Sequence, residues 1–137
     1  MAAVADPFFD TNVFVYLLSA DASKASRAEE LISQRGVVSV QVLNEIASAG
    51  LRKLGLSMRQ VRDILAVARA ACEVKPLDVT THELALDLAE RYRLAVYDAL
   101  IIAAASLAGC SVLYTEDLQH GQTFGGLVVR NPFLAAT

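Results

Sequence analysis

The sequence lacks the cysteine patterns of disulfide-rich and zinc-binding proteins. Its 137 residues include only Cys72 and Cys110, which are far apart and form no C-x-x-C pattern. Two cysteines with this spacing are too few for a zinc site or a disulfide framework. Because both have apolar neighbours, we expect them to be small buried thiols.

The sequence also lacks an excess of positive charge. It has 12 Lys and Arg against 15 Asp and Glu, which gives a formal net charge of -3. A generic nucleic-acid binder would be basic, so the net charge argues against that class. It does not exclude a binder with a local basic patch, because an acidic metal site would itself supply several negative charges.

No segment has the pattern of a signal peptide or a membrane span. No Lys or Arg precedes Lys24, and the short apolar stretch 13–18 follows Asp6 and Asp10. These features differ from those of a signal peptide. The apolar helix expected after Asp98 is too short to span a bilayer. We therefore expect a cytoplasmic protein with no membrane contact.

The hydrophobic pattern predicts alternating strands and helices in one domain, residues 1–137. With 55% hydrophobic and 20% charged residues, the chain is globular and long enough for a core. Expected strands cover 4–9, 37–40, 72–77, 111–115 and 127–130, and expected helices cover 23–34, 41–54, 58–71, 80–93 and 98–108. This alternation predicts an α/β fold with a parallel sheet covered on both faces.

Three of these helices begin near a residue suited to capping. Ser57 precedes the helix at 58, and Thr80 with Glu83 fits a capping box. Asp98 precedes a run that is apolar all round apart from Ser106, which indicates a helix in the middle of the domain. An N-cap is the simplest structural role for Asp98.

Four acidic residues lie where a parallel sheet would bring them together. Asp10 follows the first strand and Glu45 lies early in the helix after the second; Asp117 follows the fourth strand, and Asp98 opens the helix that leads to it. Each alone fits a turn, a cap or a helix dipole. Ligand crevices in such sheets lie beyond the carboxyl ends of the strands, so we expect the four to converge on a functional site.

Such a set of carboxylates indicates metal chemistry. Oxygen-only ligands suit Mg²⁺ or Mn²⁺, while His82 and His120 are expected at the surface. No P-loop, G-x-G-x-x-G or G-x-S-x-G pattern is present. The sequence therefore favours metal-assisted phosphodiester hydrolysis. A haloacid-dehalogenase-type phosphatase is disfavoured, because Asn12 stands where its D-x-D motif has a second acid.

Four motifs together resemble a PIN domain, in particular the VapC-like toxins of bacterial toxin–antitoxin pairs. They are F-D-T-N-V at 9–13, N-E at 44–45, Y-D-A-L-I at 97–101 and Y-T-E-D at 114–117, and the resemblance covers nearly the whole chain. It implies a three-layer α/β/α sandwich with a central five-stranded parallel sheet. It also implies a Mg²⁺-dependent endoribonuclease, with Mn²⁺ as a possible substitute.

The resemblance also implies roles for individual residues. Asp10 and Asp98 would be the principal metal ligands, and Glu45 and Asp117 would complete the acidic pocket. Supporting roles would fall to Thr11 or Thr115, which would hydrogen-bond the carboxylates, and to Asn12, which would stiffen the turn. The role of Glu116 is not fixed by the pattern.

The expected partners are RNA, a cognate antitoxin and a second copy of the chain. The homodimer is expected from the high apolar content and from the resemblance. A basic set on two consecutive helices would contact phosphates along a shared groove: Arg52, Lys53, Arg59 and Arg62. Two alternatives remain open, a PIN-like nuclease with a housekeeping role in RNA processing and an inactive PIN-like binding module. No core acid is missing that would favour the inactive module.

Overall fold

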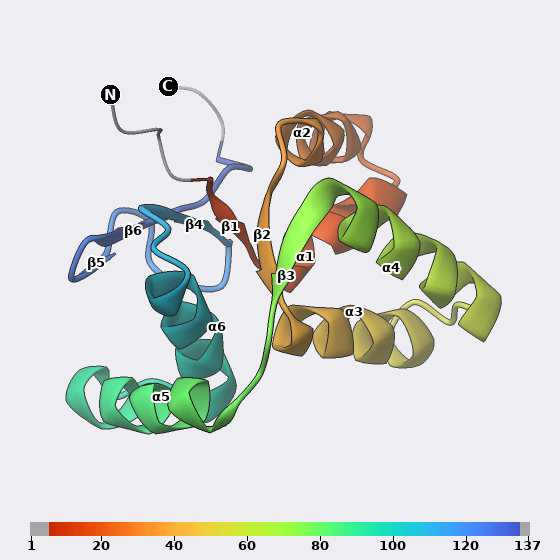
Figure 1. Cartoon of the computed structure of the whole chain (residues 1–137). Helices are drawn as coiled ribbons and strands as arrows, with labels where there is room; N and C mark the ends of the chain where they lie inside the picture. The colour runs from red at the N-terminus through yellow and green to blue at the C-terminus, as the bar shows by residue number, and fades with distance from the viewer. Residues whose placement is uncertain (1–5, 135–137) are drawn as a thin grey trace.

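The computed structural model describes residues 6–134 (Figure 1). The part of the expected first strand that begins near Val4 lies outside these residues. The strands are β1 (Phe8–Phe9), β2 (Gly36–Ser39), β3 (Cys72–Lys75), β4 (Val112–Tyr114), β5 (Thr123–Phe124) and β6 (Leu127–Arg130). The helices are α1 (Thr11–Val15), η1 (Tyr16–Leu18), α2 (Ala22–Ser33), α3 (Val40–Arg52), α4 (Met58–Ala71), α5 (Val79–Tyr92) and α6 (Val96–Leu107).

The sheet has the strand order β3-β2-β1-β4-β6-β5. Its first five strands are parallel, as the alternation of strands and helices predicts, and β5 is antiparallel to β6. The sheet therefore has six strands instead of the expected five. The sixth forms because the Gly125 and Gly126 turn, with φ +61° at Gly125, folds Thr123 and Phe124 back against β6.

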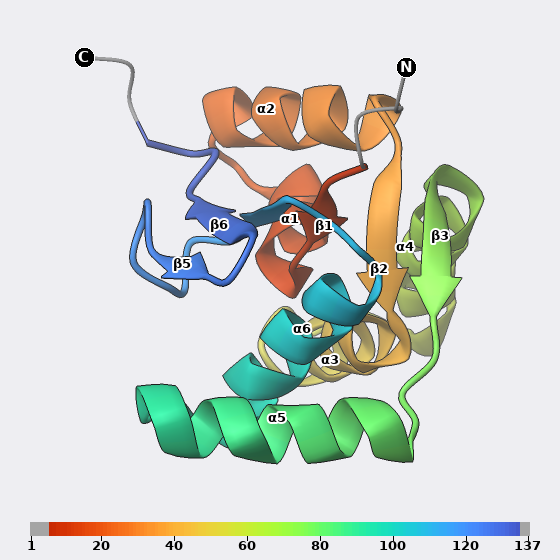
Figure 2. The same cartoon turned by 60° about the vertical axis from the view of Figure 1, so that its left-hand side comes forward.

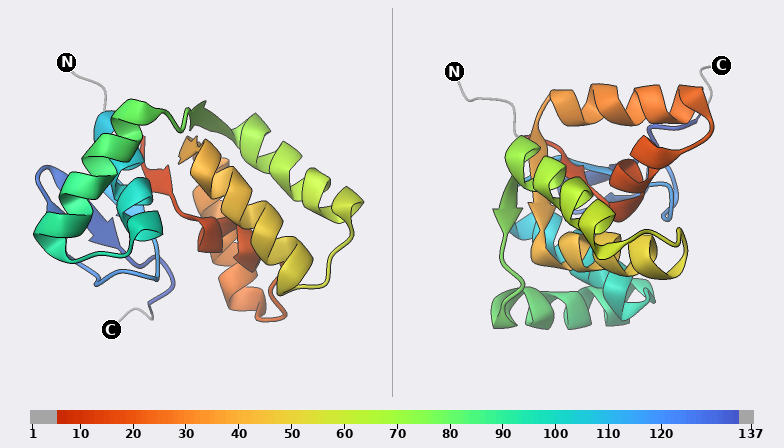
Figure 3. Two further views of the ribbon diagram at one scale, coloured as in Figure 1. Left: turned by 90° about the horizontal axis from the view of Figure 1, so that it is seen from below. Right: turned by 90° about the vertical axis from the view of Figure 1, so that its right-hand side faces the viewer.

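Helices cover both faces of the sheet, which confirms the three-layer α/β/α arrangement. The N-terminal helices α1 to α4 gather on one side, and α5 and α6 lie on the other (Figures 1 and 3). Figure 2 shows α6 crossing between the sheet and α5. In α6, the residues from Ala99 to Ala105 are buried without interruption, which agrees with the absence of a polar face in this segment.

The starts of three helices test the expected caps. Ser57 caps α4 in a capping box with Gln60, so that cap is confirmed. The expected box of Thr80 and Glu83 is wrong, because Asp78 caps α5 two residues earlier by accepting the N–H of Thr81. The N-cap role of Asp98 is also wrong: α6 begins at Val96, and Asp98 lies in its first turn. Its carboxylate is therefore available for another task.

The outermost strands of the described sheet are β3 and β5. In β3, Lys75 forms an ion pair with Glu73 at 2.8 Å, and Pro76 follows the strand directly. The other edge strand, β5, is only two residues long.

Cys72 in β3 and Cys110 before β4 are buried free thiols, as expected, and burial raises the pKa of each to about 11. Within residues 6–134, no helix has the length and apolar character needed to cross a membrane.

Candidate active site

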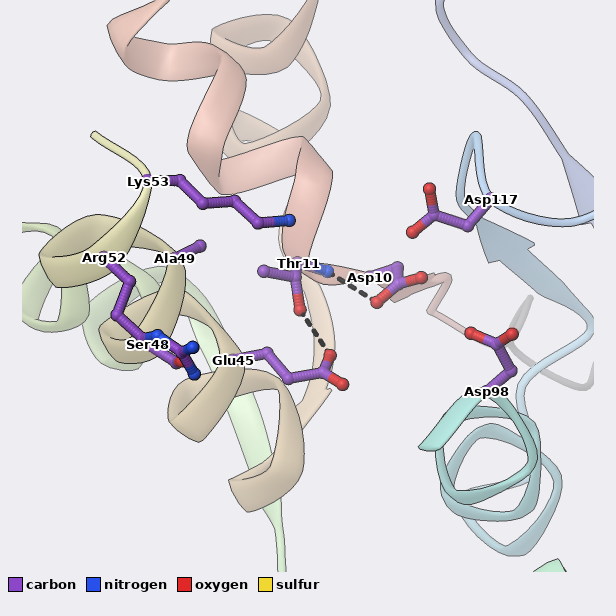
Figure 4. Close-up of a pocket in the computed structure, with 9 residues that line it drawn as sticks. All are labelled: Asp10, Thr11, Glu45, Ser48, Ala49, Arg52, Lys53, Asp98 and Asp117. Carbon is purple, nitrogen blue, oxygen red and sulfur yellow. Dashed lines mark hydrogen bonds between the residues drawn. The ribbon is translucent and has the colours of Figure 1, made fainter. Parts of the chain in front are cut away.

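The four predicted acids line one cavity of about 530 Å³ (Figure 4). The cavity lies at the carboxyl ends of β1, β2 and β4. Helix α3, which follows β2, contributes Glu45, and helix α6, which precedes β4, contributes Asp98. The structure therefore brings together the four acids that were expected to converge beyond the carboxyl ends of the strands. The lining residues are Asp10, Thr11, Glu45, Ser48, Ala49, Arg52, Lys53, Asp98 and Asp117.

Asp10 is the buried centre of the cavity wall, with 5% of its surface exposed. It caps α1 by accepting the N–H of Thr11 at 2.7 Å, and its other oxygen accepts the hydroxyl of Thr115 at 2.8 Å. Burial raises the pKa of Asp10 to about 6, since desolvation outweighs these two hydrogen bonds and the charges of Glu45 and Asp117 add to it. A carboxylate in this position is therefore costly unless a cation compensates it.

Thr115 connects Asp10 to the loop that follows β4. Its side chain is fully buried and accepts the N–H of Asp117 at 3.1 Å while it donates to Asp10. The amide of Asn12 donates to the Thr115 hydroxyl at 3.4 Å and to the Asp117 carboxylate at 3.2 Å. Asn12 therefore does more than stiffen its own turn, because it also joins α1 to the loop of Asp117.

Glu45 is held from two directions. One carboxylate oxygen accepts the hydroxyl of Thr11 at 2.8 Å, and the other accepts the Nε2 of Gln41 at 3.5 Å. Gln41 is buried and lies one helical turn before Glu45 on α3. Gln41 was not predicted from the sequence, although its i, i+4 spacing to Glu45 was a usable signal.

Asp98 and Asp117 face the cavity from its other side (Figure 4). Asp98 is half-buried in the first turn of α6, and Asp117 is exposed on the loop after β4. Burial raises the pKa of Asp98, and the nearby charge of Asp117 raises it further. The acids of the cavity thus repel one another in the absence of a cation.

Glu116 is not among the residues that line the cavity. Its Oε1 accepts the hydroxyl of Tyr16 at 2.6 Å, and the Nζ of Lys24 donates to the same hydroxyl at 3.3 Å. The hydrogen bond to Glu116 raises the pKa of Tyr16. The sequence left Glu116 without a role, and it missed Tyr16 because nothing in the local pattern joins residues 100 positions apart.

The basic set divides into two pairs. Arg52 and Lys53, at the end of α3, line the cavity beside the acids. Arg59 and Arg62 are exposed on α4 and are not among the lining residues, so their place along a groove shared by two copies of the chain stays a prediction. On α4, Val61 is buried, whereas Arg59 and Arg62 on either side of it are exposed to solvent.

Comparison with known families identifies the fold. The family model described as the PIN domain matches residues 8–123. The chain belongs to the PIN domain family. No match to a curated protein was found.

Solved structures share the fold of this PIN domain. A toxin–antitoxin complex from Klebsiella pneumoniae matches with TM-score 0.68 and 21% identity over 93% of this chain and 98% of that one. VapC20 of Mycobacterium tuberculosis, described as a toxin that cleaves the sarcin–ricin loop, matches with TM-score 0.67 and 21% identity over 81% and 89%. VapBC2 of Rickettsia felis, bound to a promoter DNA fragment, matches with TM-score 0.64 and 19% identity over 90% and 96%.

The donor set of this PIN domain fits a hard divalent cation. The four carboxylates supply oxygen ligands only, which suits Mg²⁺ or Mn²⁺. The ion pairs found among residues 6–134 are Arg27–Glu30 and Lys75–Glu73, so no basic side chain there forms an ion pair with the four acids. No three acidic, His or Cys side chains of the described chain lie close enough to hold an ion as they stand. A cation here would therefore be held by one or two carboxylates together with water, unless the carboxylates approach one another.

Proposed function

We propose that this PIN domain is a Mg²⁺-dependent endoribonuclease acting in the cytoplasm, with Mn²⁺ as an alternative metal. The observation that carries the proposal is the single cavity that holds Asp10, Glu45, Asp98 and Asp117 beside Arg52 and Lys53. The acids supply a site for a cation, and the basic pair supplies contacts for a phosphate backbone. Four independent structural acids would have no reason to share one cavity.

The chain's own residues would divide the work. Asp10 and Asp98 would be the principal ligands, with Glu45 and Asp117 completing the site. Thr115 and Thr11 orient two of these carboxylates by hydrogen bonds. The bound metal would supply an activated water and neutralise charge on the phosphodiester. The exposed side chain of Asp117 and the half-buried one of Asp98 have the freedom to approach Asp10 when a cation enters.

Cleavage of single-stranded and structured RNA in Mg²⁺ and in excess EDTA tests this proposal. Activity should require the metal, and attack by water should leave a 5′-phosphate and a 3′-hydroxyl. Equal cleavage in EDTA, or a 2′,3′-cyclic phosphate product, would contradict the metal mechanism. RNA binding without cleavage in any divalent metal would favour the inactive binding module.

Arg52 and Lys53 should contact RNA phosphates. Replacing both by Gln should weaken RNA binding and reduce the slope of log K against log salt by about 1.4, since each single-strand phosphate contact contributes about 0.7. The matched control is the double change Arg59→Gln and Arg62→Gln, which removes the same charge from α4 outside the cavity. RNA affinity measured over a range of KCl concentrations decides this, and equal slopes for both double variants would reject the assignment.

We further propose that the protein is the toxin of a toxin–antitoxin pair. The structures with the same fold include toxin–antitoxin complexes, and the acidic cavity suits an Arg or Lys from an inhibitory partner. Expression without a partner should arrest bacterial growth, and the inactive variant Asp10→Asn should not. Normal growth with an enzyme that is active in vitro would instead favour the housekeeping role in RNA processing.

A homodimer is the remaining part of the proposal. Helices α5 and α6 expose large apolar side chains, among them Leu86, Val96 and Leu107, which are 41%, 44% and 51% exposed. Exposed apolar side chains are unfavourable in water, and a dimer interface on these helices would bury them. Light scattering at micromolar concentration should give twice the chain mass of 14.7 kDa. A monomer under these conditions would remove this part.

A further inference from the structure

We propose that Tyr16 is a positioning residue for the metal site. It holds the carboxylate of Glu116 outside the cavity and so fixes the loop that presents Asp117. This inference rests on the proposed function, because it takes Asp117 to belong to a metal site. Tyr16 itself does not line the cavity and is not a catalytic residue.

The loop of Asp117 has little support from its own backbone. Residues 115–118 form no helix or strand, and Asp117 is exposed. On the cavity side, the loop is tied by Thr115 and by Asn12, which donates to Asp117 at 3.2 Å. On the other side, it is tied by the 2.6 Å hydrogen bond from Tyr16 to Glu116. Asp117 therefore sits between two points of attachment.

The hydroxyl of Tyr16 is itself held in place. The ring of Tyr16 packs edge-on against Phe133, with 4.5 Å between centroids. The Nζ of Lys24 lies 4.7 Å from the centre of the same ring and 3.3 Å from its hydroxyl. These contacts fix both the ring and the direction of its O–H bond, and a hydrogen bond to a carboxylate is among the stronger kinds.

The position of Tyr16 in the chain connects it to Asp10. Asp10 caps the N-terminus of α1, and Tyr16 follows directly at the other end of this short helix. Asn12 and Tyr16 thus attach the loop of Asp117 to the same helical unit that carries Asp10. This unit therefore holds the backbone of the Asp117 loop near Asp10 and leaves the carboxylate of Asp117 to turn.

Loss of the Tyr16 hydroxyl would remove one attachment of the loop that carries Asp117. The loop would then yield to the repulsion among the acids, and Asp117 would move away from Asp10. A cation would have to bring Asp117 back, so its affinity would fall although none of its ligands is removed.

The test is the Mg²⁺ affinity of Tyr16→Phe, measured by calorimetry and by the shift of melting temperature with Mg²⁺. The variant should bind Mg²⁺ on the order of tenfold more weakly and need correspondingly more Mg²⁺ for half-maximal cleavage. Its melting temperature in EDTA should change by only a few degrees, because the ring and its packing remain. The matched control is Tyr92→Phe, since Tyr92 also packs edge-on against a phenylalanine, Phe124, outside the cavity.

Two further variants separate positioning from general stability. Glu116→Gln keeps an oxygen that can accept from Tyr16, so it should bind Mg²⁺ nearly as well as the wild type. Glu116→Ala leaves the Tyr16 ring intact but removes the acceptor, so the loop should loosen and Mg²⁺ should bind more weakly, as in Tyr16→Phe. The Tyr16→Phe and Glu116→Ala changes should also be non-additive when combined, because they break the same contact.

The outcomes distinguish this inference from the proposed function. If the wild type binds Mg²⁺ and cleaves RNA while Tyr16→Phe and Glu116→Ala match it, the positioning role is overturned and the proposed function stands. If the wild type itself shows no Mg²⁺ binding, the proposed function fails and the positioning role fails with it. If Tyr16→Phe is poorly folded, Glu116→Ala decides the question alone.

Discussion

Asp10→Asn should melt at a higher temperature than the wild type in EDTA at pH 7 and at a lower one in saturating Mg²⁺. The ionised Asp10 is buried beside other acids, and its pKa is raised from 3.8 to about 6. At about 1.36 kcal/mol per pH unit, this shift costs the folded state on the order of 3 kcal/mol at pH 7. Asn removes that cost while keeping a side-chain oxygen that can cap α1.

The sign of the pH dependence follows from the direction of the shift. Between about pH 4 and pH 6 the folded protein binds more protons at Asp10 than the unfolded chain does, so this group destabilises the fold as the pH rises. The advantage of Asp10→Asn should therefore be largest at pH 7 and disappear near pH 4. At about 4 °C per kcal/mol, the gain at pH 7 is on the order of 10 °C.

Mg²⁺ should reverse the order. At a metal concentration one thousand times Kd, the wild type gains about 4.1 kcal/mol, which exceeds the cost of about 3 kcal/mol, and the variant, which lacks a principal ligand, gains little. Cleavage by Asp10→Asn should fall by about a hundredfold or more, since the metal supplies several kcal/mol of transition-state stabilisation. Asp98→Asn should follow the same pattern with a smaller gain in EDTA, because Asp98 is only half-buried.

Thermal melts of both proteins in EDTA and in Mg²⁺, repeated from pH 4 to pH 7, measure these effects. Asp63→Asn is the control, since it makes the same change at an exposed position of α4 outside the cavity. Parallel curves for wild type and Asp10→Asn, with no crossing on addition of metal, would contradict the metal site.

Thr115→Val should lower Mg²⁺ affinity and cleavage by about 10–100-fold, the usual effect of losing a hydrogen-bond partner behind a metal ligand. The fully buried hydroxyl of Thr115 donates to Asp10 and accepts from the backbone of Asp117 and from Asn12. Valine has a similar shape, so the packing is kept while these three contacts are lost. The backbone N–H of Asp117 would then lack its acceptor within the protein.

The conservative variant Thr115→Ser separates the hydroxyl from the packing. It restores the hydroxyl and loses one methyl group, so it should retain most of the metal affinity at some cost in stability. Calorimetric Mg²⁺ titrations of both variants decide the matter. Equal loss in Thr115→Ser and Thr115→Val would show that the methyl group, not the hydroxyl, matters at this position.

The sequence was informative where a general rule of parallel sheets applied. Asp10, Glu45 and Asp117 each follow a strand, and the rule that crevices form beyond the strand ends was enough to place them in one cavity with Asp98. Burial of α6 was equally predictable, because a segment without a polar face has only one place in a domain.

The sequence was less informative where a choice depended on geometry across the fold. Asp78 and Thr80 are both good caps two residues apart, and packing decides between them. The N-cap of α6 is Ala95, which has no side-chain acceptor. Asp98, the nearest residue with a capping side chain, therefore led to a predicted helix start that is two residues too late. The bond from Tyr16 to Glu116 depends on how η1 meets the loop after β4, which no local pattern encodes.

The two edges of the sheet determine how this protein can associate with other chains. An open edge strand is a template for uncontrolled pairing with a neighbouring chain, and it is commonly blocked by charges, proline or short length. Here β3 combines the Glu73 and Lys75 charges with Pro76, and β5 is too short to offer a continuous ladder. Strand exchange and fibre growth through either edge are therefore disfavoured. Any contact with another copy of the chain would therefore be made by the helices and not by the sheet.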